Sequence, residues 1–194
     1  FASGDVIEGG CWAHARRKFH SLYETNGSTV AAQALKQIQL LYQHEAVAKG
    51  LSPPERLAYR RQHMRPVIDA FDIWLQAQQT LVPPNSAIAK AIRYTLSNWT
   101  ALTRLLDNAQ MPIDNNAVEN LIRPLAIGRK NWLFAGSEIA GRRGAAIMSL
   151  IHSARLNGLD PQAYLNDVLE RLPTHKAKDI DELLPHRWQA ASGQ

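Results

Sequence analysis

Runs of apolar residues at helical spacing, separated by Pro and Gly, constrain the fold of this chain more than any other feature. From about residue 24 to residue 107, apolar side chains recur every three or four positions, as they do along one face of an amphipathic helix. Ser28 is placed to cap a helix that runs to about Lys49, and Gly50 is a natural stop. The pattern predicts a mainly α protein.

Further helix boundaries lie in the same region. Ser52-Pro53-Pro54-Glu55 has the residues of a capping box, with Pro at the first helical position. Pro66 should kink or split the helix that follows, because proline has no backbone N–H and clashes with the preceding turn. Asn85 or Ser86 should start another helix, which is expected to run to about Asp107.

Composition limits the class of protein. The chain has 194 residues, 45% of them apolar, which suits one domain, or one domain and a small extra piece, with a packed core. A formal charge of +5 and a pI near 9.6 favour an anionic partner, although ordinary surface lysines and arginines also explain a charge this modest. The single cysteine permits no internal disulfide and suits a reducing cytoplasm. No apolar run approaches the length of a membrane span, so no membrane partner is expected.

A short segment near the N-terminus, residues 11–23, is predicted to form a helix with one apolar and one basic face. The inward face would consist of Trp12, Phe19 and Leu22. The outward face would consist of Arg16, Arg17 and Lys18. A basic helix face is most often simply solvated, but it also suits the phosphates of DNA.

Cys11 and His14 are three residues apart, a spacing that occurs in zinc sites. A structural zinc ion needs four ligands, and no second Cys/His pair in the sequence completes the set, so zinc is not expected. His44 and His63 look isolated, and both are expected to be surface side chains.

The stretch 114–137 concentrates the residues best suited to chemistry. Asp114 or Asn115 can cap a helix there. The apolar face of that helix would consist of Val118, Leu121, Ile122 and Leu125. Glu119 lies in its first turns, away from the centre of that face, where a carboxylate can hold a metal ion or a proton; a lone Glu there can equally just complement the helix dipole. Pro124 should bend or end the helix nearby.

Cations and aromatic rings follow Glu119 at close spacing. The cations are Arg123, Arg129 and Lys130, and the rings are Trp132 and Phe134. Cations interleaved with aromatics suit a phosphate backbone and unstacked bases. Trp132 could stack on a flipped base, and a position in a core explains it equally well.

More helices are predicted after residue 137. Ser137 can cap a long helix that Asn157-Gly158 ends, and Asp160-Pro161 opens the next one. The inward residues of this next helix would be Tyr164, Leu165, Val168 and Leu169. Residues 180–184 could form one last short helix.

Two long motifs resemble the insertion-sequence-66 family of bacterial transposases. One runs from Asp114 to Ser137 (DNNAVENLIRPLAIGRKNWLFAGS), and the other runs from Gly10 to Phe19 (GCWAHARRKF). The segment 138–188 resembles the small C-terminal region of the same proteins. The resemblance is specific, because two long motifs occur in the expected order.

The resemblance implies a fold and a catalytic residue. These transposases carry an Asp-Asp-Glu triad on a ribonuclease-H-like fold, with a helical insert between the second aspartate and the glutamate. Glu119 matches the final glutamate, as catalytic residue and metal ligand. The two aspartates should precede Cys11, but only ten residues do so, and Asp5 lacks the expected context. We therefore expect the aspartates upstream, in a longer protein, and this chain to be inactive alone.

The implied fold class is the C-terminal part of a ribonuclease-H-like α/β transposase domain with a large helical insertion, followed by a small helical C-terminal region. The first part would span residues 1–137, with the insertion at about 24–107, and the second would span 138–194. Val6 and Ile7 would form a strand end, the last remnant of the first half of the sheet.

The implied activity is DNA transposition by metal-dependent phosphodiester cleavage and strand transfer, with Mg²⁺ as cofactor and transposon ends and target DNA as partners. Self-association into a homo-oligomer is expected from the family. The candidate DNA-binding residues are Arg16, Arg17, Lys18, Arg123, Arg129, Lys130 and Trp132. The candidate supporting residues are His14, Asn115, Asn116 and Asn120. The alternative is a non-catalytic helical module that binds DNA or a transposase partner, with Glu119 merely structural.

Overall fold

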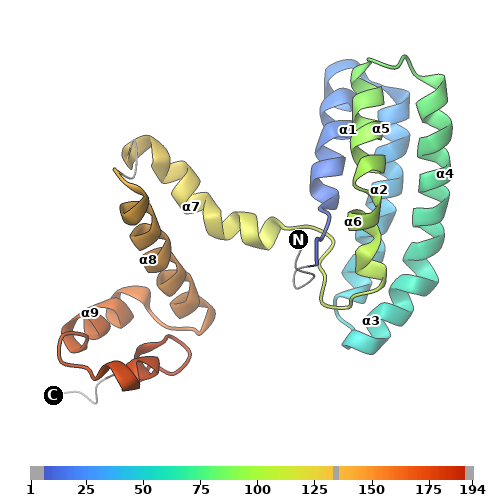
Figure 1. The fold of residues 1–194 in the computed structure, drawn as a ribbon. Coiled ribbons are helices and arrows are strands. Elements are labelled where there is room, and N and C mark those ends of the chain that lie inside the picture. Colours follow the sequence, from blue (N-terminus) through green and yellow to red (C-terminus); the bar gives the residue numbers. More distant parts are fainter. Residues whose placement is uncertain (1–6, 133–135, 191–194) are drawn as a thin grey trace. The chain divides into compact units, whose positions relative to one another are not determined.

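The computed structural model describes residues 7–132 and 136–190, and every regular element in these two ranges is a helix (Figure 1). The mainly α prediction is confirmed. The predicted strand end is wrong at Ile7, which belongs to no regular element, and Val6 lies outside the described residues. No described helix combines the length and the apolar character that crossing a lipid bilayer requires.

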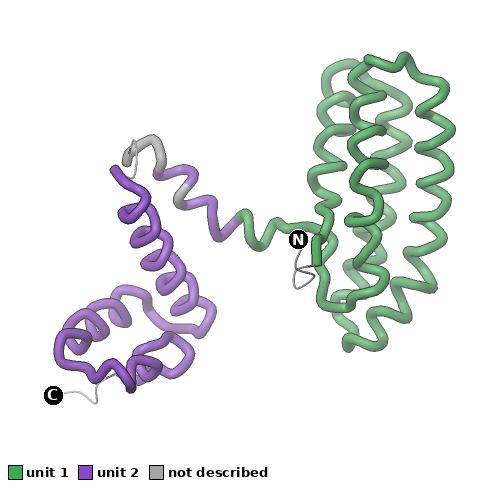
Figure 2. Tube along the Cα trace, viewed as in Figure 1, with its two compact units in different colours: residues 1–119 green, residues 120–194 purple. Residues whose placement is uncertain are grey.

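The chain divides into two compact units, residues 1–119 and 120–194 (Figure 2). The boundary falls within α7 (Asn116–Trp132), soon after the helix begins. The sequence-based division at residue 137 stays a prediction. Each unit has a hydrophobic core of its own.

Four helices of the first unit form a closed bundle (Figure 1). α1 (Trp12–Asn26) packs against α2 (Thr29–Ala48) and α5 (Ala87–Ser97), and α4 (Arg65–Leu81) packs against the same two helices. The shorter elements that complete the unit are α3 (Pro53–Tyr59), the π-helix η1 (Arg60–Met64), α6 (Trp99–Thr103) and the 3₁₀ helix η2 (Arg104–Leu106).

The predicted helix starts are confirmed where a side chain caps the backbone. The Ser28 hydroxyl accepts from the Ala31 N–H at 3.2 Å, and Ser86 does the same for Ala89 at 3.2 Å. The capping box of residues 52–55 is present. Pro66 lies in the first turn of α4, directly after η1, and the chain stays helical there while it changes from π to α geometry, so the helix is not split.

The single helix expected from Ser86 to about Asp107 is wrong, because the chain breaks it at Asn98. The Asn98 side-chain amide donates to the Tyr94 carbonyl at 2.7 Å, and its backbone has a non-helical conformation (φ −102°, ψ 10°). Asparagine competes in this way with the regular backbone hydrogen bonds of a helix. The chain restarts as α6 and then tightens into η2.

Trp12 is the centre of the bundle core. It is fully buried, its indole N–H donates to the Leu102 carbonyl at 3.0 Å, and its ring contacts Phe71 and Trp99 at centroid distances of 6.2 and 5.8 Å. Gly10 allows this close approach, since a Cβ there would meet the Leu102 backbone nitrogen at 2.6 Å. The inward orientation predicted for Trp12 and Phe19 is confirmed, and Leu22 is partly buried.

His44 and His63 are not isolated. Their rings stack at a centroid distance of 5.9 Å, Tyr59 packs against both, and both histidines are half-buried. The prediction of isolated surface histidines is wrong, because α2, α3 and η1 bring together residues that are far apart in the sequence.

The second unit contains the rest of α7, α8 (Glu138–Leu156), α9 (Pro161–Arg171) and the 3₁₀ helix η3 (Ala177–Leu183). The caps predicted at Ser137 and Asp160 are confirmed. Tyr164 is buried, and its hydroxyl donates to the Leu183 carbonyl at 2.8 Å. Leu169 is 64% exposed, so its predicted inward orientation is wrong.

Pro124 does not end α7, which continues through it to Trp132. Proline lacks the N–H that would bond to the carbonyl four residues earlier, at Asn120. Both residues are exposed, so solvent can reach that carbonyl. The predicted apolar face is present on α7 but exposed at Val118, Leu121 and Ile122, and the side chain of Leu125 lies outside the described residues.

Candidate functional site

Contacts from α1 and α2 hold the first turn of α7 against the bundle. The Trp12 backbone N–H donates to the Ile113 carbonyl at 3.1 Å, just before α7 begins. The imidazole of His14 lies against the Glu119 carboxylate, with Nε2 and Oε1 3.2 Å apart. Two motifs about a hundred residues apart in the sequence thus meet at one place.

Glu119 is anchored through its backbone and accessible through its side chain. Its N–H donates to the Asn115 carbonyl at 3.0 Å as the helix begins. The side chain of Glu119 is 40% exposed and that of His14 is 34% exposed, so a ligand can reach the carboxylate from solvent. The imidazole restricts the rotamers of the carboxylate without covering it.

Asn115 directly precedes α7 and its carbonyl accepts the first backbone bond of the helix, whereas the Asp114 side chain holds the turn that leads into it. The Oδ1 atom of Asp114 accepts from the Asn116 backbone N–H at 3.1 Å. Its Oδ2 accepts from the Asn116 side-chain amide at 3.0 Å and from the Tyr42 hydroxyl at 2.9 Å. Asn116 therefore orders the loop that leads into the helix. Burial, together with the Asp114 carboxylate, raises the pKa of Tyr42 above its ordinary value.

We expect Tyr42→Phe to lower the free energy of unfolding by about 1 kcal/mol at neutral pH, because one hydrogen bond to a carboxylate is lost. The raised pKa gives a second signature. The neutral Tyr42 hydroxyl contributes its full share of the free energy of unfolding below the ordinary tyrosine pKa of 10.0, and this contribution is lost as the pH rises above it. Between about pH 8 and about pH 11, the free energy of unfolding measured with urea should therefore fall less steeply in Tyr42→Phe than in the original chain. Tyr23→Phe, at an exposed tyrosine of α1, is the control, and equal slopes for all three proteins would contradict this assignment.

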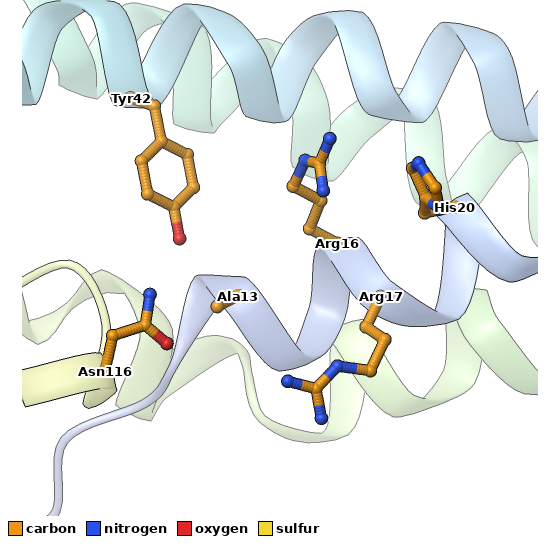
Figure 3. Close-up of a pocket in the computed structure, with 6 residues that line it drawn as sticks. All are labelled: Ala13, Arg16, Arg17, His20, Tyr42 and Asn116. Atoms are coloured by element: carbon orange, nitrogen blue, oxygen red, sulfur yellow. The ribbon is translucent and has the colours of Figure 1, made fainter. Parts of the chain in front are cut away.

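A basic hollow of about 380 Å³ opens beside this junction (Figure 3). Its lining consists of Ala13, Arg16, Arg17, His20, Tyr42 and Asn116. Figure 3 shows Arg16, Arg17 and His20 following one another along α1, and Tyr42 reaching across from α2. Arg16, Arg17 and Lys18 are all exposed, as predicted, so the cations of α1 are available to an anionic ligand.

Sequence reasoning missed the residues that hold the connector between η2 and α7. Arg60 is 1% exposed and makes a bidentate ion pair with Glu45, at 2.9 Å from Nε to Oε2 and 2.6 Å from Nη2 to Oε1. Its remaining N–H groups donate to the carbonyls of Leu105, Asn108 and Met111. Arg56 donates to the Ala109 carbonyl on the same connector. Nothing in the local sequence pattern distinguishes these arginines from exposed ones.

The other predicted site residues follow Asp114 in the sequence. Asn115 is exposed and contributes its backbone carbonyl to the first turn of α7. Asn120 and Arg123 are exposed on the part of α7 that belongs to the second unit. The side chains of Arg129, Lys130 and Trp132, and all of Phe134, lie outside the described residues.

The donor set for a metal ion is incomplete in the described part of the chain. Mg²⁺ prefers oxygen ligands, and the half-exposed carboxylate of Glu119 offers one. No group of three His, Cys, Asp or Glu side chains placed to hold an ion occurs among the described residues. Asp114 is already bonded to Tyr42 and Asn116. Glu119 therefore fits as one ligand of a shared site but does not make a site by itself.

Comparison with known proteins identifies the family. The family described as "Transposase IS66 family" matches residues 1–143, and the one described as "IS66 C-terminal element" matches residues 149–186. The chain belongs to the IS66 transposase family, which confirms the resemblance seen in its motifs.

The curated relatives come from Sinorhizobium fredii and are named only as uncharacterized proteins. Protein y4hP is 36% identical over 194 residues, which cover 94% of this chain and 35% of the relative. Protein y4jD is 38% identical over 182 residues, which cover 93% of this chain and 36% of the relative. The chain thus spans about a third of the length of these relatives. No solved structure matches the chain.

Proposed function

We propose that this chain supplies the last carboxylate of an Asp-Asp-Glu catalytic centre, Glu119, to a transposase that cuts DNA and joins its strands. The observation that carries the proposal is the junction of the two family motifs, where His14 lies 3.2 Å from Glu119. The carboxylate lies in the first turn of α7, and the basic hollow lined by Arg16 and Arg17 opens beside the same turn.

The complete centre would require two aspartates from elsewhere in a longer protein, on a ribonuclease-H-like sheet. The family membership and the coverage of only about a third of each relative support this proposal. Mg²⁺, when bound by three carboxylates, would supply charge stabilisation at the phosphodiester. In this chain, Glu119 would be a ligand, His14 would orient it, and Asp114 and Tyr42 would fix the first turn of α7. DNA would lie along the basic face of α1, and Arg123, Arg129, Lys130 and Trp132 would add contacts from α7.

A second function is favoured by the closed bundle itself. The first unit has a complete core and an exposed basic helix, which is sufficient for a helical module that binds DNA or a transposase partner without catalysis. In that case Glu119 would serve only to hold α7 against α1.

Binding of transposon-end DNA to the full-length transposase separates the two proposals. We expect Mg²⁺ to strengthen DNA binding in the original protein, because the ion offsets the repulsion between carboxylates and phosphates. Glu119→Gln should reduce this gain, and binding in the presence of a chelator should become equal or tighter. An affinity for DNA that changes neither with Mg²⁺ nor with the substitution would favour the non-catalytic module.

A further inference from the structure

A second hollow, of about 480 Å³, lies between α1 and α5 and contains residues that no family motif includes. The polar residues of its lining are His14, Arg17, Lys18 and Ser21 from α1, and Lys90 and Tyr94 from α5. None of the described residues that line it is acidic. Small apolar residues, Ala87 and Ala91, leave room for a ligand between the two helices.

Within the part of the chain that the structure describes, the cations of this hollow have no ion-pair partner. Arg17, Lys18 and Lys90 are exposed, and none of the ion pairs found among the described residues includes any of them. Arg61, Arg65 and Arg104 of the same unit, by contrast, each lie within 4 Å of a carboxylate. Three cations without a carboxylate around one concave surface favour an anionic ligand.

Tyr94 positions one of these cations. The Lys18 ammonium lies 4.3 Å from the centre of the Tyr94 ring, a cation–π contact. This contact restrains a side chain that would otherwise sample many rotamers, and it holds the charge on the side of α1 that faces α5.

His14 connects the hollow to the candidate catalytic residue. It lines the hollow and lies against Glu119. Arg17 lines both this hollow and the one that contains Arg16, so cations continue across the outer face of α1.

We propose that the hollow between α1 and α5 binds the phosphate backbone of DNA next to Glu119, with Lys90 as a direct contact and Tyr94 as a positioning residue for Lys18. This inference rests on the proposed function and extends the DNA surface from the family motif onto α5. Backbone contacts of this kind are independent of base sequence, so the hollow contributes affinity and orientation to any bound duplex.

The test is a salt titration of the binding of the full chain to a labelled random-sequence duplex of about 20 base pairs. Lys90→Gln should make the negative slope of log K against log salt shallower by about 0.9, which corresponds to about an eightfold loss of affinity at about 0.1 M salt. Lys36→Gln removes the same charge from an exposed position on α2 outside both hollows, and we expect a smaller change of slope. Tyr94→Leu should weaken binding, whereas Tyr94→Phe should restore it, because the ring is retained.

Several results would overturn this inference. In one such result, Lys90→Gln and Lys36→Gln give equal slopes of log K against log salt, while Arg16→Gln and Arg17→Gln weaken DNA binding. DNA would then follow α1 only, and the proposed function would stand. In another, Lys90→Gln loses binding to polyglutamate but binds DNA as the original chain does, which would indicate an acidic protein partner. If the original chain does not bind DNA at all, both this inference and the DNA-binding role of α1 fail.

Discussion

Arg60→Met is expected to lower the free energy of unfolding of the first unit by about 3–5 kcal/mol, the cost of leaving one partner of a buried ion pair alone. Arg60 is 1% exposed and Glu45 is 8% exposed, so solvent cannot replace the lost guanidinium. The substitution also removes the donors to the Leu105 carbonyl in η2 and to two carbonyls, those of Asn108 and Met111, on the connector that leads to α7.

The control is Arg65→Gln on the same side of the unit, where an exposed guanidinium lies 3.9 Å from Asp107. Such a pair contributes at most about 1 kcal/mol. Adding Glu45→Leu to Arg60→Met should recover part of the loss, because the lone buried carboxylate is removed. The remaining loss would measure the hydrogen bonds to the connector. A loss below about 1.5 kcal/mol for Arg60→Met alone would contradict a buried pair of this kind.

The same substitution should be visible at the candidate site. The connector leads directly to Ile113 and Asp114, which hold the first turn of α7. Amide hydrogen exchange in residues 105–113 should increase in Arg60→Met before the bundle as a whole unfolds. Unchanged exchange there would mean that Arg60 stabilises the bundle without positioning Glu119.

If Glu119 is a metal ligand, as proposed, Glu119→Gln is expected to reduce strand transfer by the full-length transposase by at least about 100-fold, because a metal ligand supports several kcal/mol of transition-state stabilisation. Glutamine has nearly the same size and can still bond to His14, so the fold should be unchanged. Glu138→Gln, the same change in the exposed first turn of α8, is the matched control. We expect it to keep full activity.

Local features of the fold were predictable from the sequence because a few neighbouring residues determine them. Ser28, Ser86, Ser137 and Asp160 each cap the helix that follows directly, and their side chains bond to a backbone N–H three residues later. The break at Asn98 was missed, because asparagine can face solvent or bond to its own backbone, and the surrounding packing decides between them.

The contacts that build the candidate site were not predictable in the same way. Tyr42 and Asp114 are 72 residues apart, and Arg60 and Met111 are 51 apart. Such pairs depend on how α2 and η1 pack against the connector, which no local pattern encodes. The motifs did mark His14 and Glu119 as candidate site residues, and the structure shows that their side chains meet. Lys90 belongs to no motif, so only its place beside α1 draws attention to it.

The most direct test of the account is strand transfer by Glu119→Cys in the full-length transposase, with Mn²⁺ compared with Mg²⁺. A thiolate binds the softer Mn²⁺ better than Mg²⁺. If Glu119 is a metal ligand, the variant should be inactive with Mg²⁺ and regain activity with Mn²⁺, whereas Glu119→Gln should regain none. Equal activity of the cysteine variant in both metals, at the level of the original protein, would contradict a catalytic role for Glu119.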